Sequence, residues 1–123
     1  MDKSESLVAL AALSQETRLD IFRLLTRAEP DGLYAGQIAD ALGGRQNTIS
    51  TNLAILARAG LIRSVREGRS IRYFADLEGM GALLSFLLED CCDGNPGACA
   101  PLTDRLVAVR NESITQEEPT HGE

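Results

Sequence analysis

The sequence predicts a mostly α-helical domain that carries one β-hairpin. Apolar residues recur at helical spacing along most of the first 90 residues, glycine-containing breaks separate those segments, and two strand-like segments flank a single glycine. With 123 residues, 44% of them apolar and 24% charged, the chain has the size and composition of one globular domain. We expect that domain over residues 1–90, a cysteine-containing loop over 91–102, and a tail over 103–123 that is partly disordered.

Three helices are predicted before residue 45. The first covers residues 4–14, and the second starts from an N-cap at Ser14 and ends before Pro30. The third is the short segment GQIADAL, which Gly43 and Gly44 interrupt. The apolar residues that the second helix is expected to bury are Leu19, Ile21, Phe22, Leu24 and Leu25.

A fourth helix is predicted in RQNTISTNLAILARA, with Gly60 as the residue just beyond its end. Its buried stripe contains Ile49, Leu53 and Leu56. The outer face of its first two turns carries short, uncharged side chains whose donors and acceptors suit base edges in a DNA major groove. The candidate base-contacting residues are Gln46, Asn47, Thr48, Ser50, Thr51 and Asn52.

A β-hairpin and a last helix follow. Residues 62–66 and 70–75 flank Glu67-Gly68-Arg69, and this pattern predicts two antiparallel strands with a glycine in the turn. The segment DLEGMGALLSFLLED predicts a helix with more apolar surface than so small a domain covers from one side. The excess suggests a partner helix, most simply from a second copy of the chain.

Positive charge is concentrated in one part of the sequence. The whole chain has a formal net charge of −6, but residues 43–75 contain six arginines against Glu67 alone, a local balance of +5. DNA phosphates respond to the local face of a protein and not to its total charge, so this segment is a candidate nucleic-acid contact. The candidate phosphate contacts are Arg45, Arg66, Arg69 and Arg72.

The order of these elements predicts a winged helix-turn-helix. A helix, a glycine-containing turn, a helix with a polar outer face and a basic hairpin occur in succession. In this interpretation the arginines hold phosphates and fix the register, while the uncharged helix face reads bases in operator double-stranded DNA. The alternative is a winged-helix module that binds protein, in which the same helices only pack.

The sequence also resembles the ArsR/SmtB family of metal- and metalloid-responsive repressors. The similar segments are ETRLDIFRLL, QIADALG, NTISTNLAILARAGLI and the arginine-rich hairpin, within residues 7–88. The resemblance implies a homodimer that pairs through its first and last helices and leaves operator DNA when an inducer binds. The residues expected at the dimer interface are Leu7, Leu10, Leu83, Leu84, Leu87 and Leu88.

The inducer site is expected at the three cysteines, Cys91, Cys92 and Cys99. The helix GQIADAL has no cysteine and the last helix has no histidine, so two other sensor positions of the family are absent. The arrangement after the last helix resembles an arsenic-responsive subgroup involved in arsenical resistance. Trivalent arsenic prefers thiolates and takes three of them, whereas structural zinc takes four ligands and the only histidine is His121. We therefore expect As(III), or Sb(III), as the inducer.

Other interpretations of the cysteines stay open. Glu89, Asp90 and Asp93 would attract a divalent cation, which favours Cd, Pb or Hg. Three cysteines is an odd number, so one disulfide would leave a free thiol, and a thiol redox sensor or buried small side chains are further alternatives.

An enzyme and a membrane protein are both disfavoured. The sequence has no Cys-x-x-Cys motif and no basic residue beside Cys91 and Cys92, so thiol–disulfide catalysis is not expected. Glu5 and the single Lys3 make a poor signal-peptide start, and the apolar runs are too short to span a bilayer. We expect a cytoplasmic protein without membrane association.

Overall fold

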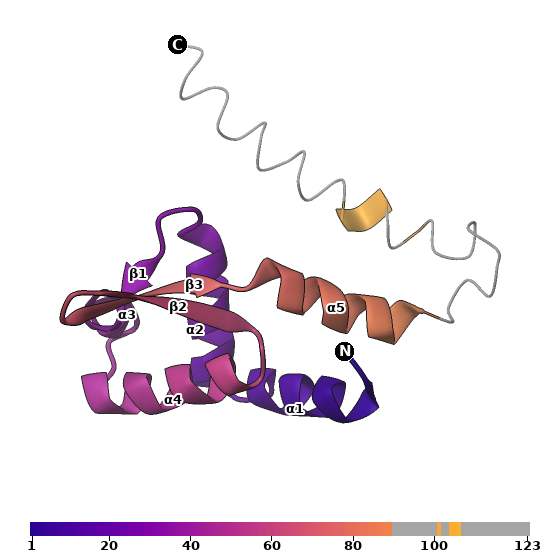
Figure 1. Cartoon of the computed structure of the whole chain (residues 1–123), viewed down its shortest axis with the longest axis horizontal. Helices are drawn as coiled ribbons and strands as arrows, with labels where there is room; N and C mark the ends of the chain where they lie inside the picture. Colours follow the sequence, from indigo (N-terminus) through magenta and orange to yellow (C-terminus); the bar gives the residue numbers. More distant parts are fainter. Residues whose placement is uncertain (90–100, 102–103, 107–123) are drawn as a thin grey trace, which may run out of the picture. The chain divides into compact units, whose positions relative to one another are not determined.

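The computed structural model of the protein describes residues 1–89, 101 and 104–106. The chain divides into two compact units, Met1–Phe86 and Leu87–Glu123. Among the described residues, no helix is long and apolar enough to cross a membrane. In chain order the elements are α1 (Lys3–Leu13), α2 (Glu16–Arg27), β1 (Leu33–Tyr34), α3 (Ala35–Leu42), α4 (Gln46–Arg58), β2 (Ile62–Glu67), β3 (Ser70–Ala75) and α5 (Leu77–Leu88) (Figure 1).

The first two helices begin at side-chain caps. The carboxylate of Asp2 accepts a hydrogen bond from the backbone N–H of Glu5 at 2.8 Å, and the Glu5 carboxylate accepts one from the N–H of Asp2 at 2.9 Å. This reciprocal pair satisfies two N–H groups that the first turn of a helix leaves free. The prediction that Ser14 caps the second helix is wrong. Ser14 is the C-cap of α1, and Gln15 caps α2 through a 2.8 Å bond from the Arg18 N–H to Oε1.

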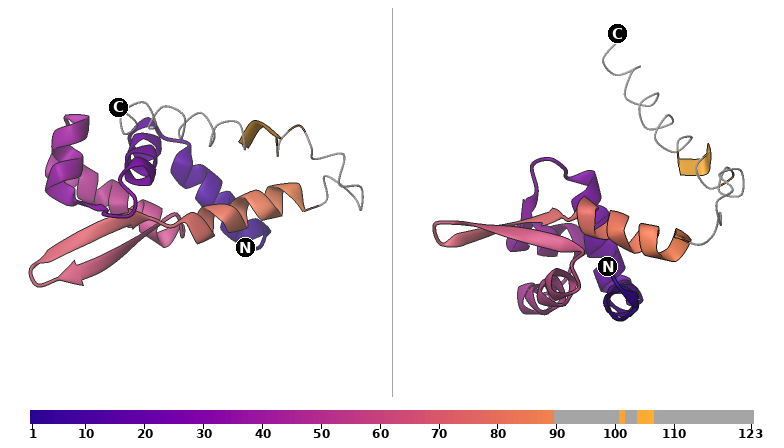
Figure 2. Two further views of the ribbon diagram at one scale, coloured as in Figure 1. Left: turned by 90° about the horizontal axis from the view of Figure 1, so that it is seen from above. Right: turned by 45° about the vertical axis from the view of Figure 1, so that its right-hand side comes forward.

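The sheet has three antiparallel strands in the order β1-β3-β2. The predicted hairpin is confirmed as β2 and β3, paired from Ile62 opposite Ala75 to Glu67 opposite Ser70. Gly68 in its turn has φ of +64°, a conformation that favours glycine. Strand β1 was not predicted, because two residues are too short to show an alternating pattern. The β2–β3 hairpin extends beyond the helices (Figure 2), and we call it the wing.

One apolar core joins the helices to the base of the wing. Its fully buried large residues come from α2, α3, α4 and α5 and from the segment before β2: Ile21, Leu25, Ile38, Ile49, Leu53, Leu56, Leu61 and Leu83. Leu19, predicted to be buried, is 42% exposed. It lies two residues before Ile21, so it falls outside the buried stripe of α2.

A close backbone approach sets the position of α5. A Cβ atom added at Gly79, in the first turn of α5, would lie 1.8 Å from the carbonyl oxygen of Gly60, just beyond α4. The Gly79 N–H also donates to the Asp76 carboxylate at 2.9 Å. Only glycine permits this contact between the start of α5 and the end of α4.

We expect Gly79→Ala to destabilise the fold by about 1–3 kcal/mol, because the added methyl group displaces α5 from the carbonyl of Gly60. Gly81→Ala is the matched control. Gly81 lies two residues further along the same helix, and a Cβ atom added there has nothing within 4 Å. The Gly81→Ala substitution should therefore leave the stability unchanged or raise it by up to about 1 kcal/mol. Urea unfolding at one fixed protein concentration measures both. Equal unfolding midpoints for the two variants would contradict this account.

Candidate nucleic-acid interface

Five of the six predicted base-contacting side chains lie together on the exposed face of α4. They form what we call the reading face: Gln46, Asn47, Thr48, Ser50 and Thr51. Arg45 is the N-cap residue of the same helix and is exposed beside this face. The hydroxyl of Thr51 donates to the Asn47 carbonyl at 3.0 Å, whereas no hydrogen bond within the described part of the chain involves the Gln46 or Asn47 side chain. The face therefore presents free amide donors and acceptors.

The sixth predicted residue, Asn52, is not on the reading face. It is only 8% exposed, and its Oδ1 accepts a hydrogen bond from Nη1 of Arg18 in α2 at 3.1 Å. Counting from Ile49, Asn52 stands at i+3 between the buried positions i and i+4, so the helical period itself predicts burial. The prediction followed the polar character of the side chain and overlooked its position in the stripe.

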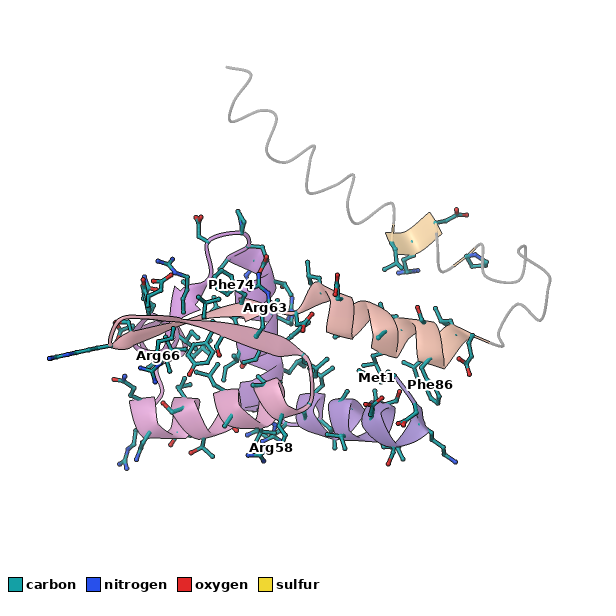
Figure 3. The ribbon with its side chains drawn as sticks, in the orientation of Figure 1. Met1, Arg58, Arg63, Arg66, Phe74 and Phe86 are labelled. Atoms are coloured by element: carbon teal, nitrogen blue, oxygen red, sulfur yellow. The ribbon has the colours of Figure 1, made fainter. Side chains whose placement is uncertain are left out.

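The wing arginines differ in how free their side chains are. Arg69 is exposed near the turn, and Arg66 is exposed with only a long 3.4 Å contact from Nη1 to the Gly68 carbonyl. Arg63 instead stacks on Phe74, its cross-strand partner, with the guanidinium carbon 4.3 Å from the ring centroid (Figure 3). Such a cation–π contact holds Arg63 against the sheet.

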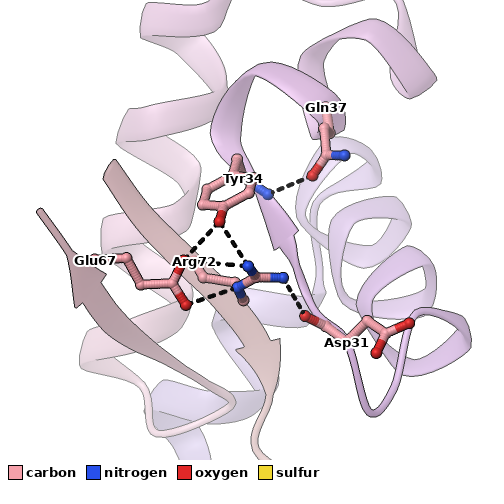
Figure 4. A network of polar contacts seen from close by, with 5 residues as sticks. All are labelled: Asp31, Tyr34, Gln37, Glu67 and Arg72. Carbon is pink, nitrogen blue, oxygen red and sulfur yellow. Dashed lines mark hydrogen bonds and ion pairs between the residues drawn. The ribbon is translucent and has the colours of Figure 1, made fainter. Parts of the chain in front are cut away.

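Arg72, predicted to contact phosphate, forms an internal network instead (Figure 4). Its Nε lies 2.9 Å from Oε2 of Glu67, and its Nη1 donates to the carbonyl of Asp31 at 2.9 Å. Its Nη2 donates to the hydroxyl of Tyr34 at 2.6 Å, and that hydroxyl donates to Glu67 at 2.6 Å. The network ties both strands of the wing to β1 and to the start of α3.

The network also removes a charge from the candidate interface. Hydrogen bonds from Arg72 and Tyr34 lower the pKa of Glu67, and the bond to Glu67 raises the pKa of both Tyr34 and Arg72. Glu67 is therefore ionised and Arg72 protonated at neutral pH, and their charges cancel. The prediction that Arg72 holds a phosphate is corrected on this ground: its guanidinium makes four hydrogen bonds within the chain, and its role is to hold the wing.

A polar groove connects the reading face with the wing. It has a volume of about 400 Å³ and is open to solvent. Gln46 and Ser50 of α4 line one side, and Arg69 and Ser70 line the other. Ala35 and Gly36, in the first turn of α3, also line it. The fold thus brings together, around one groove, side chains of α4 and of the wing that are 19 to 24 residues apart in the sequence.

A second groove lies between α1, the end of α4 and α5. It has a volume of about 530 Å³, and its walls include Val8, Arg58 and Ala82. The two helices α1 and α5 that contribute to this groove also carry exposed apolar side chains, of which Val8 lines the groove itself. We call them the α1/α5 apolar surface: Leu7, Val8, Leu10 and Leu84. Val8, which is 52% exposed, was not among the interface residues predicted from the sequence.

The predicted interface residues of α5 are only partly on this surface. Leu84 is 41% exposed, but Leu83 is 2% exposed and belongs to the core, so the assignment of Leu83 to a dimer interface is wrong. Burial within its own chain leaves it no surface to offer. Leu87 and Leu88, in the second unit, are exposed and half-buried respectively and stay a prediction.

The predicted inducer ligands, Cys91, Cys92 and Cys99, lie outside the described residues. Within the described ranges, no group of three or more His, Cys, Asp or Glu residues could hold a metal ion. The boundaries proposed at residues 90 and 102 also stay predictions.

Comparison with known sequences identifies the central part of the chain as a helix-turn-helix domain. The helix-turn-helix domain family matches residues 13–65, which include α2, α3 and α4. An uncharacterised HTH-type transcriptional regulator of Bacillus subtilis, YbzH, is 38% identical over 97 residues, covering 68% of this chain and 95% of the relative.

Solved structures agree with the fold. An ArsR-like transcriptional regulator from Rhodococcus sp. RHA1 is 31% identical with a TM-score of 0.62, over 88% of this chain and 92% of that one. The homodimeric winged helix-turn-helix domain of Mb0332 from Mycobacterium bovis, a possible ArsR-family regulator, is 28% identical with a TM-score of 0.56, over 71% and 81%. A possible transcriptional regulator for arsenical resistance is 26% identical with a TM-score of 0.58, over 81% and 93%.

These relatives are matched over 81–95% of their own lengths. The chain therefore belongs to the ArsR family of winged helix-turn-helix transcriptional regulators and is not an enzyme.

Proposed function

We propose that the protein is a homodimeric repressor that places the reading face of α4 in the DNA major groove. The observation that carries this proposal is the polar groove, which places Gln46 and Ser50 opposite Arg69 on one exposed face. A DNA strand needs a reading element and a cationic element on the same side, and α4 and the wing supply them. The five residues of the reading face contact bases.

Of the four arginines that the sequence suggests as phosphate contacts, we retain Arg45, Arg66 and Arg69. Each is exposed, whereas Arg63 stacks on Phe74 and Arg72 pairs with Glu67. Three free arginines per subunit give six per dimer. Neutralising phosphates releases condensed counterions, so these six charges would make the affinity strongly dependent on salt concentration.

The α1/α5 apolar surface supports the dimer. Helix α1 is apolar on nearly all sides: Ala9 and Ala12 are buried in the core, while Leu7, Val8 and Leu10 face outward. A helix with two apolar faces needs a cover on each, and this chain supplies one of them. A second copy would supply the other, as the homodimeric state of the related Mycobacterium bovis domain suggests.

The proposed inducer is arsenite, bound by Cys91, Cys92 and Cys99. Arsenous acid carries three hydroxyl groups. When a thiol replaces one of them, an As–S bond forms, the As–O bond breaks, and the hydroxyl takes the thiol proton and leaves as water. Three thiols therefore consume one arsenous acid and release three waters, with no oxidant or reductant needed. The similarity to a possible regulator for arsenical resistance supports this choice.

Induction would require that arsenite binding at the cysteines and operator binding by the dimer are energetically coupled. The cysteines directly follow α5, so binding that restrains them alters the chain at the end of a helix that contributes to the apolar surface. A coupling of about 1–3 kcal/mol would weaken operator binding by roughly 5- to 150-fold.

We expect Arg69→Ala to weaken binding to every DNA duplex and to reduce the slope of log affinity against log salt concentration by about 1.8, or 0.9 for each lost phosphate contact in the dimer. Arg63→Ala, in the same hairpin, is the control and should leave the slope within about 0.5 of the original. Fluorescence anisotropy between 50 and 200 mM salt measures both. Equal slopes for Arg69→Ala and the unaltered protein would remove Arg69 from the interface.

We expect Val8→Glu to convert the dimer into a monomer, because a carboxylate at the centre of a buried apolar contact loses its hydration. Leu19→Glu is the matched control: Leu19 is likewise an exposed aliphatic residue, 42% accessible, but it lies on α2 outside the apolar surface. Sedimentation velocity gives the mass of each variant. A dimeric Val8→Glu protein, or a monomeric Leu19→Glu protein, would place the interface elsewhere.

We expect one arsenite to consume three thiols per chain in the fully reduced protein, and Cys91→Ser, Cys92→Ser and Cys99→Ser each to abolish tight binding, because each removes one of three As–S bonds. Free-thiol titration and thiolate-to-metal absorption measure this, with cadmium and zinc in parallel. Tighter cadmium binding would make a divalent cation the inducer. If peroxide releases the protein from DNA and arsenite, cadmium and zinc do not, the cysteines form a redox sensor instead.

A further inference from the structure

Arg18 connects three helices at a point between the dimer surface and the reading face. Its Nε donates to the carbonyl of Ala12 in the last turn of α1 at 2.7 Å. Its Nη1 donates to Oδ1 of Asn52 in α4 at 3.1 Å. Arg18 itself belongs to the first turn of α2. One partly buried guanidinium thus bonds the last turn of α1 to the middle of α4.

A polar amide at the buried position 52 is unexpected and calls for a structural explanation. Asn52 belongs to the buried stripe of α4, together with Ile49, Leu53 and Leu56. An apolar residue would pack there without the free-energy cost of burying a polar group. Asparagine is also a poorer helix former than leucine. Its amide oxygen has a partner only because Arg18 reaches it. The two residues therefore form a pair that contributes a directional hydrogen bond in place of apolar packing.

We propose that Arg18 and Asn52 are positioning residues that fix the orientation of α4 relative to α1, and thereby set the half-site spacing that the dimer accepts. The inference rests on the proposed function, in which α1 contributes to the dimer contact and α4 enters the DNA. Hydrogen bonds between fixed donors and acceptors restrict rotation and sliding of packed helices, which apolar contacts alone allow more freely.

Spacing is the property that such a bond would control. A two-fold dimer reads two half-sites about 34–36 Å apart, and each inserted base pair moves one half-site by about 3.4 Å and rotates it by about 35°. A dimer whose α4 helices are held rigidly to α1 rejects the altered spacing. A dimer whose α4 helices can tilt accepts it, at little loss of contact within each half-site.

The test uses the full-length protein and an operator selected from random double-stranded DNA. Three duplexes are compared by fluorescence anisotropy: the selected operator, the same operator with one base pair inserted between its half-sites, and a duplex without half-sites. The main variant is the double substitution Arg18→Met with Asn52→Leu, which replaces both polar partners by apolar side chains and so preserves the fold. Asn52→Asp keeps an acceptor for Arg18 and serves as the conservative rescue, and Leu56→Met disturbs the same stripe without touching the bond.

We expect the unaltered protein, Asn52→Asp and Leu56→Met to bind the lengthened operator about tenfold more weakly than the selected one, and the double variant to lose less than about threefold. Its affinity for the duplex without half-sites should be unchanged. If the double variant keeps the tenfold preference, or if its affinity for all three duplexes falls together, the residues are merely structural and the inference is overturned. If the unaltered protein binds no duplex, the proposed function fails, and with it this inference.

Discussion

The exposed face of α4 depends on the burial of the opposite face. Ile49, Leu53 and Leu56 are 0–1% exposed, and burying each side chain contributes about 1.5–3 kcal/mol. These contacts fix which residues point outward, because in a helix the choice of one face determines the other. The reading face is consequently a result of core packing. Its polar residues make few bonds within the chain and contribute little to the stability of the fold.

Much of the architecture was predictable because its signals are local. Helical periodicity located five helices that begin and end within a few residues of the expected positions, and Gly60 and Gly68 adopt the positive φ values expected beyond a helix and within a hairpin turn. The failures at Asn52, Leu83 and Arg72 have another origin. Asn52 bonds to Arg18, and Arg72 bonds to Asp31 and Tyr34, all more than 30 residues away, while Leu83 packs into a core built from several elements. Residue type alone cannot reveal whether such partners are present. Of these, only the burial of Asn52 was available from the helical period.

The arginines illustrate how tertiary structure changes the meaning of a charge cluster. Six arginines against one glutamate in residues 43–75 suggest one uniform basic surface. The fold divides them by function: Arg72 and Glu67 anchor the wing to β1 and α3, Arg63 packs on Phe74, and Arg58 lies in the wall of the groove beside α1. Cationic side chains are thus used for building the wing as well as for contacting a ligand. In the proposed complex, fewer arginines would face the DNA than the sequence suggests, and the bonds of Arg72 hold the wing that carries Arg66 and Arg69.

The small side chains on the inner face of α1 complete the physical argument. Ser6, Ala9 and Ala12 are 0–3% exposed, so α1 approaches the core closely and has no long side chains there to absorb a displacement. Protein interiors are densely packed, and a shift of one helix is passed to its neighbours rather than taken up locally. Helix α1 packs against both α2 and α4. A change at its outer, apolar face therefore reaches α4 through direct contact, and Arg18 gives that contact a fixed direction. In the proposed repressor, sensing and DNA binding would need no separate transmitting domain, because α1, which would meet the partner subunit, also packs against α4, which would read the DNA.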